Sequence, residues 1–448
     1  MRTSATGQQR AGSTRTLLTG ADGAVVKRTV LPGGLRVVSE SIPTSRSVAL
    51  GFWVGVGSRD ETPKSSGASH FLEHLLFKGT RKRGPFEIAA EIEEVGGDLN
   101  AFTTKEVTCY HARVLADDLP LAVDVVGDMV SSCLITPEDV ESERGVVLEE
   151  IAMNEDDFTD VAAQKLSAQL FSASRLGVPV VGSPGSLKEI TRANVWRHYR
   201  RHYRPNDVVI TASGAVDHEQ LVREVRKIAA HWVTDRSATP TPARALRSRP
   251  AKFRTVPGCE VISRPTEQAH IMLGVPAYSR VDDRRWSLAV LETALGSGMA
   301  SRLFQEVREK RGLVYSVASF RSGYADAGML GVYAGTLPDK ADTTIEVIQE
   351  VLAEVAKNGL TDDEVARAKG QLRGSTVLDS EDPGSRMSRL ADTEILTGAF
   401  TSLDDTLERI ELVTSEQVAR VAAHLLTQPQ TLTVVGPYES DRTFGSGD

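Results

Sequence analysis

A chain of 448 residues is too long for one small hydrophobic core, and its length predicts roughly two to four domains. With 40% hydrophobic and 25% charged residues it has the composition of an ordinary globular protein, and no stretch holds the roughly 18 apolar residues of a membrane-spanning helix. The formal net charge of −8 argues against a nucleic-acid surface, and an odd count of three cysteines argues against a disulfide framework and fits a reducing compartment.

Residues 1–24 are expected to form a flexible N-terminal tail. Residues 1–21 carry three arginines, several Ser and Thr and no acidic residue, a composition that resembles an organellar transit peptide. The segment has almost no apolar face, however, which favours a disordered bacterial tail over a targeting signal.

Strands and helices alternate through the N-terminal half of the chain. Leu31-Pro-Gly-Gly34 is a hairpin signal, Ser69 can cap a following helix, and Gly96-Gly97 can end another. Residues 98–114 should be extended. The other expected elements are strands at 25–30, 35–38 and 48–56 and helices at 70–77, 85–95, 119–132 and 137–151. The glycine-rich turn of a nucleotide-binding unit is missing from this alternation.

The second half of the sequence repeats the first. Thr136-Pro-Glu-Asp-Val140 returns 225 positions later as Thr361-Asp-Asp-Glu-Val365, and Leu72–Gly79 aligns with Ala289–Gly296 at an offset of 217. Such a long period indicates duplication of a whole domain and not a solenoid. A proline-rich linker at 234–254 separates the halves, so we expect domains at 25–233 and 255–440 and a C-terminal tail at 441–448.

The sequence His70-Phe-Leu-Glu-His74 has the spacing of a metal site on a helix. Residues at i and i+4 share a helix face, so both imidazoles can reach one ion, and zinc favours nitrogen ligands. Glu73 lies near the same face and could deprotonate a metal-bound water. A catalytic zinc usually has three protein ligands, so another part of the chain must supply one.

The acidic helix at 137–151 is the obvious source of the third ligand. Glu143 and Glu150 lie two turns apart on one face, but spacing alone does not choose Glu150 over Glu149. The glutamates that this helix offers are Glu138, Glu141, Glu143, Glu149 and Glu150.

Together these segments resemble the signature of the pitrilysin/insulinase superfamily of inverted zincins. The match rests on Gly67-Ala-Ser-His-Phe-Leu-Glu-His-Leu-Leu-Phe-Lys-Gly-Thr80 and on Glu143-Arg-Gly-Val-Val-Leu-Glu-Glu150, and it is nearest to the branch of the mitochondrial processing peptidase and its bacterial homologues. The resemblance implies Glu150, 76 positions after His74, as the third ligand. It also implies Glu143 as a glutamate that supports the ligands from outside the coordination sphere.

The resemblance implies one zinc ion per chain and Glu73 as the general base of a zinc endopeptidase. A short His-x-x-Glu-His string alone can arise by chance as a polar patch on a helix, but the spaced glutamates and the repeat oppose that interpretation. In the repeat, the positions of the ligands and the base fall on residues that bind zinc poorly, so the second half should be metal-free. These residues are Ser287, Val290, Leu291, Ala368 and Ser375.

The resemblance also suggests residues that contact substrate. Asn100, Ala101 and Phe102 match the family's edge strand, which pairs with an extended peptide through backbone hydrogen bonds; the alternative is an ordinary internal strand. Phe77, near the metal face, could line an apolar pocket, but it is nearly as compatible with the core.

Arg308 and Tyr315, seven positions apart, resemble the family's substrate-binding pair in the C-terminal half. The alternative is a surface arginine and a half-buried tyrosine. Nearby, Gly296-Ser-Gly298 resembles a shortened form of the glycine-rich loop of noncatalytic partner subunits.

The fold class implied is α+β, with two homologous halves, each a mainly antiparallel sheet with packed helices, forming a clamshell around a chamber. The expected function is zinc-dependent hydrolysis of extended peptides or unfolded segments. The alternatives are a noncatalytic scaffold and a chaperone-like peptide-binding protein. We expect a homodimer in the bacterial cytoplasm; a heterodimer with a glycine-rich-loop subunit, or the mitochondrial matrix, are the alternatives.

Overall fold

The computed structural model of the protein describes residues 9–20, 22–247 and 253–444. These residues divide into two compact units, each built from more than one stretch of chain. Unit 1 takes the described residues of 1–151, 179–247 and 378–402, and unit 2 those of 152–178, 248–377 and 403–448. Each unit has its own sheet and its own hydrophobic core.

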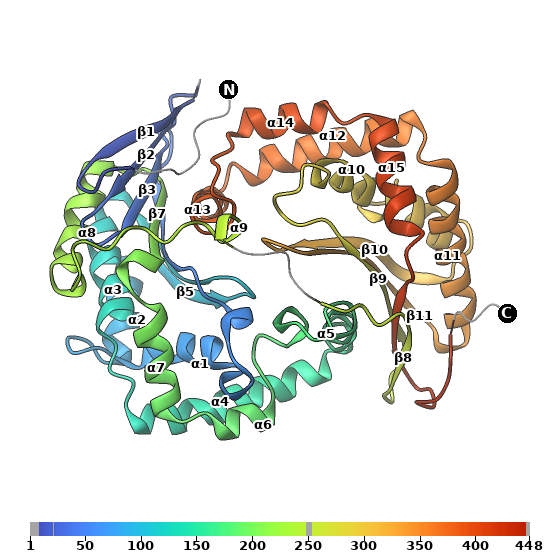
Figure 1. Ribbon diagram of the computed structural model, residues 1–448, viewed down its shortest axis with the longest axis horizontal. Coiled ribbons are helices and arrows are strands. Elements are labelled where there is room, and N and C mark those ends of the chain that lie inside the picture. The colour runs from blue at the N-terminus through green and yellow to red at the C-terminus, as the bar shows by residue number, and fades with distance from the viewer. Residues whose placement is uncertain (1–8, 21, 248–252, 445–448) are drawn as a thin grey trace. The chain divides into compact units, whose positions relative to one another are not determined.

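Unit 1 contains a seven-stranded sheet in the order β1-β2-β3-β7-β4-β6-β5 (Figure 1). Neighbouring strands are antiparallel, except that β3 runs parallel to β7. The strands are β1 (Thr14–Thr19), β2 (Val25–Val30), β3 (Arg36–Ser41), β4 (Ser47–Val54), β5 (Asp98–Thr103), β6 (Thr108–Leu115) and β7 (Val208–Gly214).

Helices cover both faces of this sheet. The main core lies between one face and a layer that includes α1, α3 and α8, because alternate strand residues such as Leu50, Phe52 and Ile210 point to that side. The opposite face presents Ala49, Trp53 and others to α13. The helices of unit 1 are α1 (Ala68–Leu75), α2 (Pro85–Glu93), α3 (Leu119–Ser132), α4 (Pro137–Asp156, within unit 1 to Ile151), α6 (Pro184–Glu189), α7 (Arg192–His202), α8 (His218–Trp232), α9 (Arg244–Arg247) and α13 (Pro383–Asp392).

Unit 2 contains a five-stranded sheet in the order β10-β11-β9-β12-β8. Only the β8–β12 pair among its described strands is parallel. The strands are β8 (Gly258–Ser263), β9 (Ala269–Ala277), β10 (Val314–Gly323), β11 (Gly328–Thr336) and β12 (Thr431–Gly436). The helices are α5 (Phe158–Leu170), α10 (Arg285–Gly296), α11 (Ala341–Asn358), α12 (Asp362–Asp379, within unit 2 to Val377), α14 (Leu403–Glu411) and α15 (Ser415–Leu426).

The two sheets repeat one topology. The order β3-β7-β4-β6-β5 in unit 1 matches β8-β12-β9-β11-β10 in unit 2, and the parallel pair occupies the same place in each. The segments that repeat in the sequence also occupy matching places in the two units. Helix α1 follows β4 along the chain as α10 follows β9, and α4 follows the long helix α3 as α12 follows α11. The predicted α+β class with two homologous halves is thus confirmed.

The units nevertheless exchange helices with respect to the expected domains 25–233 and 255–440. α5 belongs to unit 2, where it packs on β9 and β12, and α13 belongs to unit 1, where it packs on β4 and β7. The physical reason is that each sheet has apolar side chains on both faces. Helix α13 covers the second face of the unit 1 sheet, and α5 covers the second face of the unit 2 sheet.

The described parts of the expected tails and linker contain regular secondary structure or packed side chains. The segment expected as a flexible tail contains β1, which pairs with β2; its residues 1–8 and 21 lie outside the described residues. The expected linker 234–254 includes α9, and 248–252 lie outside the described residues. At the C-terminus the ring of Phe444 packs 5.0 Å from that of Tyr438, whereas 445–448 fall outside the description.

Most predicted elements occur close to their expected positions, with two corrections. α4 continues to Asp156 instead of ending at Ile151. Ser69 does not cap α1: the residue before the helix is Gly67, and Ser69 lies within the first turn. Within the described ranges, none of the helices has the length and apolar character needed to cross a bilayer.

Candidate metal centre

Two histidines on α1 and one glutamate on α4 converge in unit 1. His70 and His74 lie one helical turn apart, with ring centroids separated by 4.8 Å. The Oε2 atom of Glu150 lies 3.6 Å from Nε2 of His70 and 3.5 Å from Nε2 of His74. Candidate ligand atoms of the three residues all lie within 4.8 Å of one another. The three sequence-predicted ligands therefore come together.

These residues fit a zinc ion. Oε2 of Glu150 is buried and has no hydrogen-bond partner among the described residues, although two imidazole nitrogens face it. Burial, followed by the neighbouring His74, lowers the pKa of His70 to about 4, so its imidazole is neutral at pH 7, as a metal ligand must be. Two nitrogens and one carboxylate oxygen match the donor set of a catalytic zinc with an open position.

Glu143, which the resemblance names as a supporting residue, contacts His74. Its carboxylate is buried, and Oε2 lies 3.3 Å from Nδ1 of His74. If Nδ1 carries the proton and donates it to Glu143, Nε2 keeps its lone pair on the ligand side. Sequence reasoning missed Lys78, whose Nζ lies 2.5 Å from Oε1 of Glu143. A signal was available, because Lys78 follows His74 by one turn.

Glu73, the predicted general base, lies on α1 between the two histidines in sequence. It precedes His74 on α1, and burial raises the pKa of its carboxyl, while a hydrogen bond from the Thr103 side chain opposes that shift. Its Oε2 atom is buried and has no hydrogen-bond partner among the described residues. Thr103, at the end of β5, was missed because it is distant from the motif in sequence.

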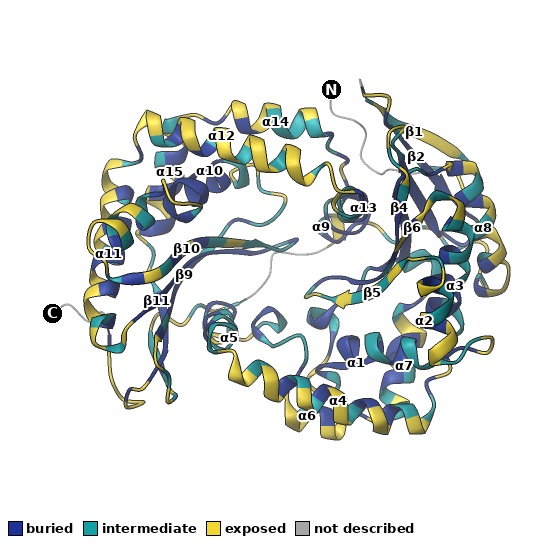
Figure 2. Cartoon of the chain, turned by 180° about the vertical axis from the view of Figure 1, so that it is seen from behind, coloured by how far each residue is buried: buried dark blue, intermediate teal, exposed yellow. Residues whose placement is uncertain are grey.

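The predicted substrate-binding strand is β5, which lies at the edge of the unit 1 sheet. Figure 2 shows it partly exposed, whereas β4 and β6 are largely buried. The side chains of Asn100 and Phe102 are exposed, and Phe102 contacts Trp53 on the face opposite α1. Ala101 points to the α1 side and packs against the main core.

Phe77 packs against the main core, with its ring 6.5 Å from that of Tyr110. It is only partly buried, so both the core and the pocket interpretation remain compatible with its position.

Arg308 and Tyr315 lie together in unit 2. The Arg308 guanidinium stacks over the rings of Phe304 and Tyr315, at 4.7 and 5.6 Å from their centroids. Tyr315 is 76% exposed, which contradicts the half-buried tyrosine of the alternative interpretation.

Unit 2 lacks a metal centre at the matching place among its described residues. The positions that correspond to the histidines fall on α10, where Ser287 and Leu291 are buried, and those that correspond to Glu143 and Glu150 fall on α12 as Ala368 and Ser375. Throughout the described ranges, His70, His74 and Glu150 make the one cluster of three or more such side chains suited to a metal.

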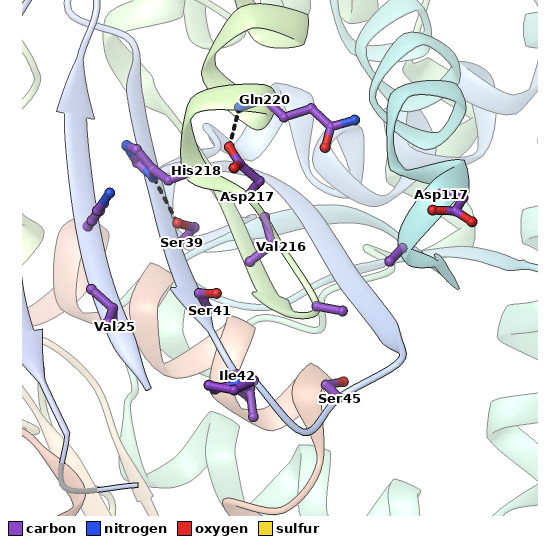
Figure 3. A pocket seen from close by; sticks show the side chains of 14 residues that line it. Val25, Ser39, Ser41, Ile42, Ser45, Asp117, Val216, Asp217, His218 and Gln220 are labelled. Atoms are coloured by element: carbon purple, nitrogen blue, oxygen red, sulfur yellow. Dashed lines mark hydrogen bonds between the residues drawn. The ribbon is translucent and has the colours of Figure 1, made fainter. Parts of the chain in front are cut away.

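A polar pocket in unit 1 is lined by residues other than those of the metal centre (Figure 3). It has a volume of about 590 Å³ and includes His218, whose ring nitrogens lie 2.8 Å from Oγ of Ser39 and 2.7 Å from Oγ1 of Thr29. Burial lowers the pKa of His218 to about 4. None of the predicted site residues lines this pocket.

The sequence matches one peptidase family along most of its length. Residues 36–183 match the insulinase family (peptidase family M16), and residues 189–372 match the M16 inactive domain. The chain is 50% identical over 427 residues to an uncharacterized zinc protease of Streptomyces coelicolor, which covers 95% of this chain and 92% of that protein. An uncharacterized zinc protease of Mycobacterium tuberculosis is 48% identical over 419 residues, covering 93% and 94%.

Solved structures show the same fold. A Pseudomonas fluorescens structure described as a peptidase M16 inactive domain superposes with a TM-score of 0.83 at 21% identity, covering 94% of this chain and 99% of that one. A protease from Helicobacter pylori gives 0.82 at 20% identity, covering 91% and 98%. With half of its residues identical to those of a relative that spans nearly the whole chain, this protein belongs to the insulinase family of zinc proteases, peptidase family M16.

Proposed function

We propose that this protein is a zinc endopeptidase that hydrolyses extended peptides or unfolded segments, with one zinc ion per chain. The observation that carries the proposal is the convergence of His70, His74 and Glu150. The neighbouring Glu73 has a buried Oε2 atom without a hydrogen-bond partner among the described residues. When bound, zinc would polarise the scissile carbonyl and lower the pKa of a water molecule. The donor set and the names of the relatives both favour zinc as the metal.

Glu73 would act as the general base. Its carboxylate accepts a proton from the attacking water and afterwards returns it to the leaving amine. Burial raises the pKa of this carboxyl, which makes its carboxylate a stronger base toward the attacking water than a solvated glutamate. The Thr103 hydroxyl would hold the carboxylate in place during the reaction.

The edge strand β5 would hold the substrate. An extended peptide can add to an exposed edge through backbone hydrogen bonds, largely independent of its sequence. Residues 100–102 lie on this strand, which ends at Thr103 beside Glu73. Arg308 and Tyr315 both carry donors that can bind substrate carbonyls, and we propose that they do so.

A noncatalytic scaffold or a peptide-binding chaperone of the same fold is the competing function. Such a protein has no need of the ligands, yet this chain keeps all three and the base. Zinc content and peptide cleavage separate the candidates, since neither competitor turns over substrate.

The test uses the purified full-length protein, its zinc content and hydrolysis of a mixed peptide library. His70→Ala and Glu150→Gln should both lose zinc and activity, because each removes one of three ligands. Glu73→Gln should keep zinc and lower kcat by about 10²–10⁴-fold, the usual contribution of a general base. Wild-type protein that binds zinc but cleaves nothing in the library, with or without a chelator, would contradict the proposal.

The assembly is also a proposal. The resemblance implies a homodimer, or a heterodimer with a glycine-rich-loop subunit. The mass of the purified protein in solution distinguishes a dimer of this 48.4 kDa chain from a monomer.

A further inference from the structure

The helix that carries both histidines is short and lacks an ordinary cap. α1 has eight residues, too few to be stable alone, so tertiary contacts must hold its position. The first backbone N–H groups of a helix have no partner within it. The residue before α1 is Gly67, which has no side chain to accept from them.

Gly67 cannot easily be replaced by a capping residue. Its φ of 91° lies in the left-handed region, and an added Cβ would approach the backbone oxygen of Val181 to 2.7 Å. The capping group for α1 must therefore come from elsewhere in the chain.

Glu61 supplies it. One carboxylate oxygen accepts from the backbone N–H of Gly67 at 2.8 Å, and the other accepts from that of Ser69 at 2.7 Å. Glu61 is only 5% exposed, and its negative charge lies at the positive end of the helix dipole. Charge-assisted hydrogen bonds of this kind are short and directional.

The capped residues adjoin the first ligand. Ser69 immediately precedes His70, and its hydroxyl oxygen lies 3.2 Å from Nε2 of the buried His198 on α7. The first turn of α1 is thus fixed on one side by Glu61 and on another by α7. A change in the direction of this turn would move the imidazole of His70 relative to Glu150.

We infer that Glu61 is a positioning residue of the metal centre: by fixing the first turn of α1 it orients His70 and sets the affinity for zinc. The inference rests on the proposed function only in taking these three residues as zinc ligands. Residues that orient ligands from outside the coordination sphere typically change metal affinity by about 10–100-fold.

The experiment compares Glu61→Gln with a matched capping variant, Asp217→Ala. Glutamine keeps the shape but turns an NH₂ group toward one of the two N–H donors, so one hydrogen bond is lost. Asp217 caps α8 in the same unit, where its Oδ1 accepts from the N–H of Gln220 at 2.7 Å (Figure 3), and α8 carries no ligand. Each variant loses a hydrogen bond that caps a helix, but only the cap made by Glu61 adjoins the metal centre.

Zinc dissociation constants are measured by competition with a chelator, and Co²⁺-substituted proteins are compared by visible absorption. Glu61→Gln should weaken zinc binding by about 10–100-fold and alter the Co²⁺ spectrum. Asp217→Ala should leave both close to wild type. Glu61→Asp, whose shorter side chain can reach only one donor, should give an intermediate affinity and serves as a second variant if the glutamine protein does not fold.

Unchanged zinc affinity and an unchanged Co²⁺ spectrum in a folded Glu61 variant would overturn the inference, as would an equal loss in Asp217→Ala. These readouts do not depend on turnover. If wild-type protein binds zinc but cleaves no peptide, the proposed function fails while the role of Glu61 is still decided by affinity.

Discussion

Replacing His198 by glutamine should remove part of the acid sensitivity of unit 1. His198 lies on α7, is 7% exposed, and contacts Ser69 at the start of the metal-binding helix. Burial, and then the neighbouring His202, lower its pKa from 6.5 to about 3. The folded protein therefore keeps this imidazole neutral under conditions in which the unfolded chain protonates it.

The sign follows from proton binding. Above pH 6.5 neither state binds a proton at this ring, and the full stability is present. As the pH falls from 6.5 toward 3, only the unfolded state gains the proton, and each pH unit costs about 1.36 kcal/mol. Between pH 7.5 and pH 5.0 the wild-type protein should lose about 2 kcal/mol through His198 alone.

Urea unfolding at the two pH values measures this loss. Tryptophan fluorescence reports mainly on unit 1, which contains Trp53, Trp196 and Trp232 among the four tryptophans of the chain. His198→Gln should be less stable than wild type at pH 7.5, but its drop to pH 5.0 should be smaller by about 2 kcal/mol. Other buried histidines, such as His218, are present in both proteins and cancel in the difference.

The exposed His231 provides a control on α8, since His231→Gln should show the same drop as wild type. An equal drop in His198→Gln and wild type would refute the reasoning, because the buried ring would then bind its proton as readily in the folded as in the unfolded chain.

Two further predictions concern a side-chain pair in unit 2 and a buried carboxylate in unit 1. Tyr315→Phe removes only the hydroxyl of a 76% exposed ring, so zinc content and stability should be unchanged while kcat/KM falls by about 3–10-fold, and Arg308→Ala should lower it further; normal kinetics in both would exclude substrate binding here. Glu394→Gln should lower the free energy of unfolding by about 3–5 kcal/mol, because two buried arginines would lose their counter-charge. Oε1 of Glu394 lies 3.2 Å from Nε of Arg28, and Oε2 lies 3.5 Å from Nη1 of Arg36. The exposed Lys82→Gln should cost less than about 1 kcal/mol in the same urea titration, and an equal cost for both would contradict the second prediction.

The elements that local pattern determines were predicted well. The helix at 119–132 was placed at its observed bounds, and the hairpin from 25 onward occurs as β2 and β3. The i, i+4 spacing placed His70 and His74 on one face of α1. Local spacing could not select Glu150 from the acidic helix; the family resemblance did, and the structure brings that residue to both histidines.

The residues that support the site were not predictable in this way. The sequence pattern does not indicate Glu61, because Ser69 matches the usual pattern of a helix cap, whereas the actual capping carboxylate lies eight residues before Ser69. Thr103 reaches Glu73 only because the strand that ends in Thr103 packs against α1. Both contacts depend on tertiary structure, which residue spacing does not encode.

The exchange of α5 and α13 between the units has a physical basis in buried charge. On β3, Glu40 is 2% exposed and accepts hydrogen bonds from Arg386 at 2.9 Å and Arg389 at 3.1 Å, both on α13. The register of the parallel pairs puts Ile262 of β8 at the position that Glu40 occupies on β3.

If α13 packed on the unit 2 sheet, its two arginines would therefore face the aliphatic side chain of Ile262 where they need a carboxylate. If α5 packed on the unit 1 sheet, Glu40 would be buried without a cation. Each of these wrong helix–sheet pairings would leave a buried charge without a partner, which typically costs several kcal/mol of stability. α5 instead offers apolar side chains to its own sheet, including Ala162, Leu166 and Leu170. Helices α5 and α13 occupy corresponding positions in the two halves of the repeat. The buried charges destabilise the wrong pairing and so specify which sheet each helix covers.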